Sequence, residues 1–188
     1  MRREITGFSN PLLKEIRGLR EKKLRKRAGL FLAEGLRIMT EAREAGFLPE
    51  MLFRVKDRQL HDLEVTLEAE VLDNGGDVIE TSADIMAKLS GKDNAQTVVG
   101  VYRDHGTALG DLDRSTAPIW LVAQSMRDPG NLGTMLRTGD AVGAGGLVLI
   151  DDCTDPFSVE SVRASMGAIF TQKIVQCRWE EFTAWLRS

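Results

Sequence analysis

The sequence predicts an α/β protein built from two domains, and three observations support this prediction. Apolar or β-branched runs alternate with helical patterns between Leu30 and Tyr102, which is typical of an α/β layer. A polar, glycine-containing stretch interrupts the alternation at residues 106–117. The alternation then resumes at Ile119 and continues to the end of the chain. We therefore expect domains at residues 1–105 and 118–188, joined by a linker.

The first domain is expected to begin with a helix. Asn10 and Pro11 form a helix start, because asparagine is a good N-cap and proline is tolerated at the first helical position. Gly18 interrupts the apolar stripe of this helix, and a basic segment continues to Gly29. The expected strands are Leu30–Ala33, Met51–Val55, Val78–Glu80 and Thr97–Tyr102. The expected helices between them are Leu36–Ala45, Arg58–Leu72 and Ala83–Leu89.

The second domain is expected to contain a parallel sheet. Its strands are predicted at Ile119–Ala123, Leu147–Ile150 and Lys173–Val175. Its helices are predicted at Gly130–Val142, Val159–Met166 and Trp179–Leu186. A parallel sheet must be covered on both faces, and the sequence offers no obvious partner for the apolar stripe of the last helix. We therefore expect an uncovered surface that drives association.

The stretch Asp128–Gly143, DPGNLGTMLRTGDAVG, is the centre of the second domain. Asp128 is placed as an N-cap, and the glycines of the first turn allow a ligand or another backbone to approach closely. The first-turn amides and the helix dipole favour an anion. Arg137 follows Gly133 by four residues, on the same helix face. A helix start with a solvated arginine is the plainer interpretation of the same pattern.

Composition excludes several classes of protein. The 188 residues are 43% hydrophobic and 28% charged, as in ordinary soluble globular proteins. No apolar run reaches membrane-spanning length and no secretory signal follows Arg2 and Arg3, so a cytoplasmic location is expected. The two cysteines and two histidines are too widely spaced for a metal site, and no metal is expected.

Charge is distributed unevenly along the chain. The segment from Lys14 to Arg27 has eight basic and two acidic residues, a net charge of +6 in a chain whose net charge is −3. Such segregation is expected of a surface that contacts RNA phosphates, and a solvated helix face on an acidic protein would look the same. The candidate phosphate contacts are Lys14, Arg17, Lys22, Lys23, Lys26 and Arg27.

Two motifs in the second half go beyond a generic α/β pattern. The first is Asn-x-Gly-x-x-x-Arg, present as Asn131, Gly133 and Arg137. The second is an arginine–serine–glycine run, present in Arg163–Ala168. With these motifs the chain resembles SpoU-type RNA methyltransferases of the knotted SPOUT class. The first half resembles the ribosomal-protein-like RNA-binding extension of that family, with matches at Ser9-Asn10-Pro11, FLAEGLR (residues 31–37) and LSGKDNAQTVVGV (residues 89–101).

The resemblance implies a function. It implies methyl transfer from S-adenosylmethionine to a ribose 2′-hydroxyl of ribosomal or transfer RNA, by a homodimer with its active site at the interface. Arg137 and Asn131 are the implied catalytic residues, and Arg163 and Ser165 are implied RNA contacts. Because arginine stays protonated in most sites, we favour Arg137 as a clamp on a phosphate that lowers the pKa of the hydroxyl.

The sequence departs from the family in one respect. The family continues with Gly-x-Glu-x-x-Gly and Ser-Leu-Asn segments that form the knot and hold S-adenosylmethionine, and neither occurs before Ser188. The expected fold is therefore an α/β RNA-binding domain followed by a partial, parallel-sheet Rossmann-like SPOUT domain, truncated at its C-terminus, with no cofactor-binding residue assigned. Two other functions stay open, a non-catalytic RNA-binding module and a nucleotide-binding Rossmann half.

Overall fold

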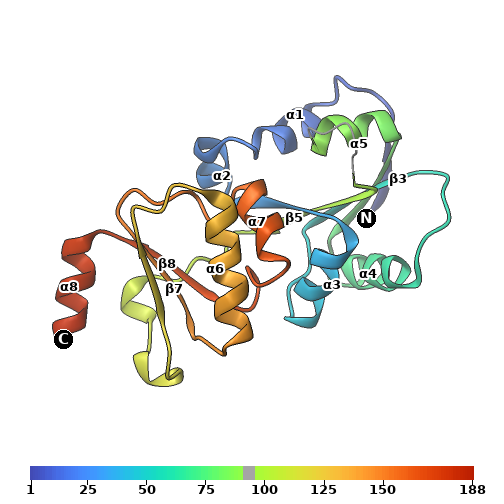
Figure 1. Cartoon of the computed structure of the whole chain (residues 1–188). Coiled ribbons are helices and arrows are strands. Elements are labelled where there is room, and N and C mark those ends of the chain that lie inside the picture. The colour runs from blue at the N-terminus through green and yellow to red at the C-terminus, as the bar shows by residue number, and fades with distance from the viewer. Residues whose placement is uncertain (91–95) are drawn as a thin grey trace. The chain divides into compact units, whose positions relative to one another are not determined.

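The computed structural model describes residues 1–90 and 96–188, which form two compact units, Met1–Asp104 and His105–Ser188 (Figure 1). Each unit contains one β-sheet with helices packed on it, so the predicted α/β class is confirmed. Residues 106–117, predicted to be a linker, belong to the second unit. Two short 3-10 helices, η1 (Leu109–Asp111) and η2 (Arg114–Thr116), lie in this segment.

The sheet of the first unit is mixed. Its strands are β1 (Arg2–Ile5), β2 (Leu30–Glu34), β3 (Met51–Val55), β4 (Asp77–Thr81) and β5 (Val98–Arg103), in the order β1-β4-β3-β5-β2. β4 pairs in parallel with β1 and β3, whereas β5 pairs antiparallel with β2 and β3. The sequence did not predict β1, because three of its four residues are charged. Only Ile5 of this strand is buried, so long-range pairing with β4 forms it rather than its own pattern.

The described residues of this unit form α1 (Pro11–Gly18), α2 (Lys22–Ala28), α3 (Leu36–Glu44), α4 (Asp62–Asp73) and α5 (Ala83–Ser90). Helices α2 to α5 pack on the sheet, and α1 packs on α5. The predicted start of α1 is confirmed, since Asn10 Oδ1 accepts a hydrogen bond from the Leu12 amide at 2.9 Å. The basic segment forms two helices, because α1 ends at Gly18. A Cβ on Gly18 would lie 2.8 Å from Leu24 Cδ1, so this glycine lets α2 fold back closely on α1.

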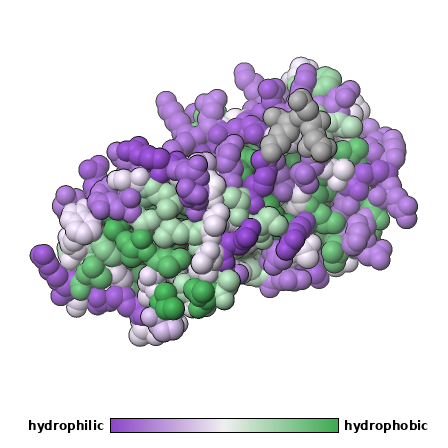
Figure 2. All heavy atoms as spheres, viewed as in Figure 1, coloured by the Kyte–Doolittle hydropathy of each residue, from purple (hydrophilic) through white to green (hydrophobic). Residues whose placement is uncertain are grey.

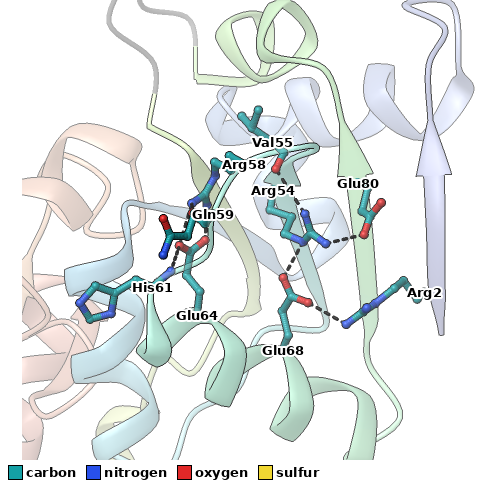
Figure 3. Close-up of polar contacts among 9 residues, drawn as sticks. All are labelled: Arg2, Arg54, Val55, Arg58, Gln59, His61, Glu64, Glu68 and Glu80. Atoms are coloured by element: carbon teal, nitrogen blue, oxygen red, sulfur yellow. Dashed lines mark hydrogen bonds and ion pairs between the residues drawn. The ribbon is translucent and has the colours of Figure 1, made fainter.

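A network of charges centred on the buried Arg54 and Glu68 ties three strands of the first unit to α4 (Figure 3). Arg54 of β3 is 8% exposed, and its Nε lies 2.6 Å from Glu68 Oε1 on α4. The same guanidinium pairs with Glu80 of β4, while Glu68 also accepts from Arg2 of β1 at 2.8 Å. Removing one partner of a buried ion pair commonly costs about 3–5 kcal/mol, so Arg54 is expected to be important for the stability of this unit.

His61 has a structural role in the same region. Its Nδ1 accepts a hydrogen bond from the Leu63 amide at 3.1 Å, and the Glu64 carboxylate accepts from the His61 amide at 3.4 Å. This reciprocal arrangement caps the start of α4. Arg58 in turn pairs with Glu64 (Figure 3). His61 is therefore the N-cap residue of α4.

The sheet of the second unit is parallel throughout, as predicted. Its order is β6 (Leu121–Gln124), β7 (Gly146–Ile150) and β8 (Lys173–Cys177). The helices are α6 (Pro129–Ala141), α7 (Val159–Ser165) and α8 (Trp179–Arg187). β6 begins two residues later than the sequence indicates, and Ile119 lies outside the strand, 44% exposed.

The prediction that α8 has no partner was wrong. Phe182 of α8 is buried in a cluster with Leu112, Val148, Ile150 and Val175. Trp185 and Leu109 pack against the same cluster. The segment 106–117 and α8 therefore cover one face of the parallel sheet together. The sequence pattern missed this because the contact joins residues about seventy positions apart, and periodicity reports only local faces.

Candidate active site and basic surface

Helix α6 begins as the sequence predicts. Asp128 has extended backbone angles, and its Oδ1 accepts a hydrogen bond from the Asn131 amide at 2.6 Å. Pro129 occupies the first helical turn, where its missing N–H costs nothing. The preceding turn is tight, since Ser125 has a φ of +53° directly after β6. These local features fix where α6 leaves the sheet and hence where its first turn lies.

Gly133 is a point of close contact between α6 and α7. A Cβ built on Gly133 would lie 2.6 Å from the Ser161 carbonyl oxygen and 2.7 Å from the Ser165 amide nitrogen. The sequence left open whether a ligand or another backbone approaches this glycine, and the structure answers that it is the backbone of α7. The two helices lie side by side in Figure 1. The contact therefore brings the two family motifs together.

Arg137 lies one turn beyond Gly133 on α6. Its side chain is exposed, and so is that of Asn131. Within residues 1–90 and 96–188, neither side chain makes a hydrogen bond or an ion pair. An arginine that is not committed to an internal carboxylate keeps all five N–H donors for a ligand. The arrangement is therefore compatible with phosphate binding by Arg137.

The second motif occupies the end of α7. Arg163 is half-buried, and Ser165 is fully buried. The Ser165 hydroxyl donates to the Val162 carbonyl oxygen at 2.7 Å and accepts from the Ile169 amide at 3.4 Å. Met166 follows with a φ of +53° and ends the helix. In this chain Ser165 therefore shapes the turn after α7, and an RNA contact by its hydroxyl stays a prediction.

The basic segment divides into exposed and internal residues. The six candidate phosphate contacts, Lys14, Arg17, Lys22, Lys23, Lys26 and Arg27, are all exposed. Arg25, in contrast, is 5% exposed. Its guanidinium donates to the Leu19 and Arg20 carbonyl oxygens at 2.8 and 2.7 Å. Arg25 therefore fastens the start of α2 to the end of α1.

Arg20 is the second internal arginine of this segment. It donates to the carbonyl oxygens of Leu89 and Ser90, at the end of α5. It also pairs with Glu34 of β2 at 2.7 Å, a carboxylate whose side chain is 2% exposed. Arg20 thus joins the α1–α2 junction to α5 and β2. The six exposed residues named above are called the basic surface. Arg20 and Arg25 hold the two helices of this surface, α1 and α2, in place.

Two of the family matches in the first half meet in space. Gly35 follows Glu34 with a φ of +98°, and a Cβ there would lie 2.9 Å from Gln96 Oε1. The FLAEGLR and LSGKDNAQTVVGV segments are therefore neighbours at the end of β2. Residues 91–95 of the second segment lie outside the described residues.

The carboxyl edge of the parallel sheet is organised by Asp151. Its Oδ2 accepts from Gln124 Nε2 at 2.8 Å, and its Oδ1 accepts from the Trp179 amide at 3.0 Å. The hydrogen bond from Gln124, followed by that from the Trp179 amide, lowers the pKa of Asp151 from its ordinary value. Asp151 therefore joins the end of β6 to the first residue of α8. The sequence did not single out this residue, because its partners are about 27 positions away on both sides.

The described part of the chain contains no group of three or more His, Cys, Asp or Glu side chains arranged to hold a metal ion. His105 Nε2 lies 2.8 Å from the Ile169 carbonyl oxygen, and its ring stacks on Phe170.

None of the helices in the described residues has both the length and the apolar character needed to cross a membrane.

Comparison with known proteins agrees with the two-unit organisation. Residues 10–100 match the MRM3-like substrate binding domain, and residues 118–188 match the SpoU rRNA Methylase family. The solved structure of an AdoMet-bound rRNA methyltransferase from Sinorhizobium meliloti superposes with a TM-score of 0.90 at 36% identity. That match covers 100% of this chain and 69% of the other.

Curated relatives are named as ribosomal RNA enzymes. The 23S rRNA (guanosine(2553)-2'-O)-methyltransferase RlmP of Bacillus subtilis is 29% identical over 175 residues, which are 93% of this chain and 65% of the relative. The human mitochondrial rRNA methyltransferase 3 is 29% identical over 86% of this chain and 39% of the relative. The chain thus spans two thirds or less of these curated relatives. The domain matches, the structural similarity and the two motifs joined at Gly133 show that the chain belongs to the SpoU family of rRNA methylases.

Proposed function

We propose that this chain acts in methylating a ribose 2′-hydroxyl of ribosomal RNA, with S-adenosylmethionine as the methyl donor. The observation that carries the proposal is the contact at Gly133, which holds the Asn131–Arg137 motif of α6 against the Arg163–Ser165 motif of α7. The names of the relatives support the substrate class, and the AdoMet-bound Sinorhizobium meliloti structure supports the donor.

In the proposed reaction a bond forms between the ribose oxygen and the methyl carbon while the bond from that carbon to sulfur breaks. The hydroxyl is a weak acid and must release its proton to solvent water in the process. An arginine held beside the adjacent phosphate favours the oxyanion that develops, because the guanidinium is a fixed positive charge. The exposed Arg137 is assigned this task. Asn131, six residues earlier and one to two turns away on α6, is assigned a supporting hydrogen bond in the same site.

S-adenosylmethionine supplies an activated methyl group on a positively charged sulfur. The residues of this chain at the carboxyl edge of the sheet do not fit such a ligand by themselves. Gln124 and Asp151 are hydrogen-bonded to each other, and the second carboxylate oxygen of Asp151 is used by the Trp179 amide. We therefore assign no cofactor contact within these 188 residues and no step of the reaction to such a contact.

Binding of the RNA is assigned to the basic surface of α1 and α2. The six side chains are exposed, and within the described residues they have no ion-pair partner, so their charge is available to phosphates. Arg163 is assigned a further contact near the reacting ribose. The strong local charge favours RNA even though the chain as a whole has a net charge of −3.

A homodimer is part of the proposal. Figure 2 shows apolar residues gathered on one face of the second unit, beside α8. The exposed large apolar side chains of this unit are Ile119, Val122, Val142, Trp179 and Leu186. Val122 lies on β6, an edge strand of the sheet. Exposed apolar side chains of this kind favour an interface between protein chains. A cytoplasmic location also stays a proposal.

The experiment that tests the function is single-turnover methylation of ribosomal RNA with labelled S-adenosylmethionine. It is run on the 188-residue chain and on the chain extended at its C-terminus with the corresponding region of the Sinorhizobium meliloti relative. We expect the extended chain to place label at a ribose, recognised by resistance of the adjacent phosphodiester to alkali. RNA binding without methyl transfer by the extended chain would instead favour the non-catalytic RNA-binding module.

A further inference from the structure

An exposed aromatic ring lies shortly before the basic segment in the chain. Phe8 is 50% exposed, in the turn that precedes α1. The other aromatic residues of the first unit, Phe31, Phe47, Phe53 and Tyr102, are buried or half-buried. Packing does not explain why this ring points outward, since exposing an apolar ring sacrifices the free energy that its burial would contribute.

The ring is held in a defined place. The Asn10 amide donates to the Gly7 carbonyl oxygen at 3.2 Å, which closes the turn around Phe8. Asn10 then caps α1. The Lys88 ammonium of α5 lies 3.9 Å from the centroid of the Phe8 ring, within the range of a cation–π interaction. Contacts between α1 and α5 keep the two elements together. A ring fixed in this way loses little conformational entropy when a ligand stacks on it.

The two helices next to Phe8, α1 and α5, carry exposed cations. Lys14 and Arg17 are exposed on α1, three residues apart and therefore on one helix face. Helical side chains tilt toward the N-terminus of their helix, so these two lean toward the turn that contains Phe8. Lys88 adds a third exposed cation. An aromatic ring among cations is the arrangement with which proteins bind single-stranded nucleic acid, by stacking a base and neutralising the backbone.

We propose that the face of the Phe8 ring opposite Lys88 is a stacking platform for an unpaired base of the RNA, with Lys88, Lys14 and Arg17 contacting phosphates beside it. The occupant is an unpaired base, because the faces of bases in an A-form duplex are covered by their neighbours. This inference rests on the proposed RNA function and adds to it a site that reads the single-stranded character of the substrate. It also gives a role to the turn before Ser9-Asn10-Pro11.

The test compares the binding of short unstructured RNA with that of an RNA duplex, for the wild type and for Phe8→Ala, Phe8→Leu and Phe8→Trp. Loss of one base stack is expected to weaken binding of the unstructured RNA by about fivefold to a hundredfold. Phe8→Leu should lose nearly as much as Phe8→Ala, because leucine keeps the apolar bulk without an aromatic face. Phe8→Trp should bind as well as or better than wild type. Duplex binding should be unchanged in all three.

Salt dependence separates stacking from charge. The slope of log affinity against log salt should be the same for Phe8→Ala and the wild type, since Phe8 releases no counterion. Leu63→Ala, which removes a similarly exposed apolar side chain from α4, is the matched control and should bind both RNAs like the wild type. Equal affinity of Phe8→Ala and wild type for unstructured RNA would overturn the stacking site while leaving the proposed function intact. A wild type that binds neither RNA would overturn both, and equal losses for duplex and unstructured RNA would show a general apolar contact instead of a stacked base.

Discussion

Gly133 of α6 and Ala164 of α7 lie so close that a Cβ on the glycine would be 2.4 Å from the alanine Cβ. Real Cβ atoms do not approach to this distance, so the two helices would have to move apart if Gly133 carried a side chain. Because Arg137 and Arg163 project from these helices, the spacing of the helices also sets the spacing of the proposed site.

Gly133→Ala is therefore expected to destabilise the second unit. The added methyl group would meet the backbone of Ser161 and Ser165, which cannot rotate away, so a loss of about 1–3 kcal/mol is expected. Urea unfolding followed by circular dichroism measures it. The control is Gly110→Ala in η1, where an added Cβ meets nothing within 4 Å and stability should change by less than about 0.5 kcal/mol. Equal stability of the two variants would contradict this account of the α6–α7 contact.

In the chain extended at its C-terminus, Arg137→Lys should reduce the rate of methyl transfer. Lysine keeps the charge but loses the planar pair of donors that fits a phosphate, so a fall of about a hundredfold in single-turnover rate is expected, with little change in RNA affinity. Asn131→Ala should cost less, since a neutral hydrogen bond contributes about 1 kcal/mol. A melting curve provides the control, because an exposed side chain with no partner in the described residues should leave stability unchanged. A wild-type rate in the lysine variant would end the catalytic assignment.

Neutralising Lys22, Lys23, Lys26 and Arg27 to glutamine should weaken RNA binding for all sequences alike. Each lost phosphate contact is expected to reduce the slope of log affinity against log salt by about 0.7–0.9. A salt titration by fluorescence anisotropy measures both affinity and slope. Lys173→Gln with Arg187→Gln, two exposed positions of the second unit, serves as the control and should leave the slope unchanged. The assignment of the basic surface fails if the fourfold variant behaves like this control.

Docking of α8 should depend on pH through Asp151. Because hydrogen bonds hold the pKa of this carboxylate below its ordinary value of 3.8, its contribution to stability is present at neutral pH and is lost as the pH falls through the lowered pKa. Asp151→Asn should therefore melt at a lower temperature than the wild type at pH 7, and the difference should shrink in acid. Asparagine also tolerates the φ of +59° at this position.

Asp152→Asn is the matched control for this prediction. Asp152 is highly exposed and lies 3.8 Å from Arg127, itself exposed, so its removal should have no effect on the melting temperature at either pH. Scanning calorimetry between pH 3 and pH 7 makes the comparison. A pH-independent difference between Asp151→Asn and the wild type would show that the charge of Asp151 does not contribute.

The sequence predicted those parts of the fold that local rules determine. The start of α6 follows from Asp128 and Pro129, whose capping preferences act within a few residues. The parallel strands of the second unit follow from apolar runs of strand length. The sequence did not predict β1, because Arg2 and Arg3 are charged and give no strand pattern. Pairing with β4 stabilises this strand.

Prediction of the candidate site was limited in the same way. The motifs of α6 and α7 named Asn131, Arg137 and Arg163, but only the fold shows that Gly133 joins them through backbone contact. The basic run gave the charge of α1 and α2 and could not tell internal from exposed arginines. Arg25 became distinguishable only when its carbonyl partners were known. Long-range contacts of this kind leave little trace in residue spacing.

Leu112 and Phe182 together cover one face of the sheet in the second unit, and this limits where a fragment of that unit can begin. The family match starts at residue 118. A fragment that starts there would lack Leu109 and Leu112, so the parts of Val148 and Val175 that these leucines cover would be exposed to water. A fragment that starts at His105 keeps them. A fragment that keeps this face of the sheet covered is therefore longer than the region that the family match marks, because Leu112 belongs to the same buried cluster as Phe182 of the last helix.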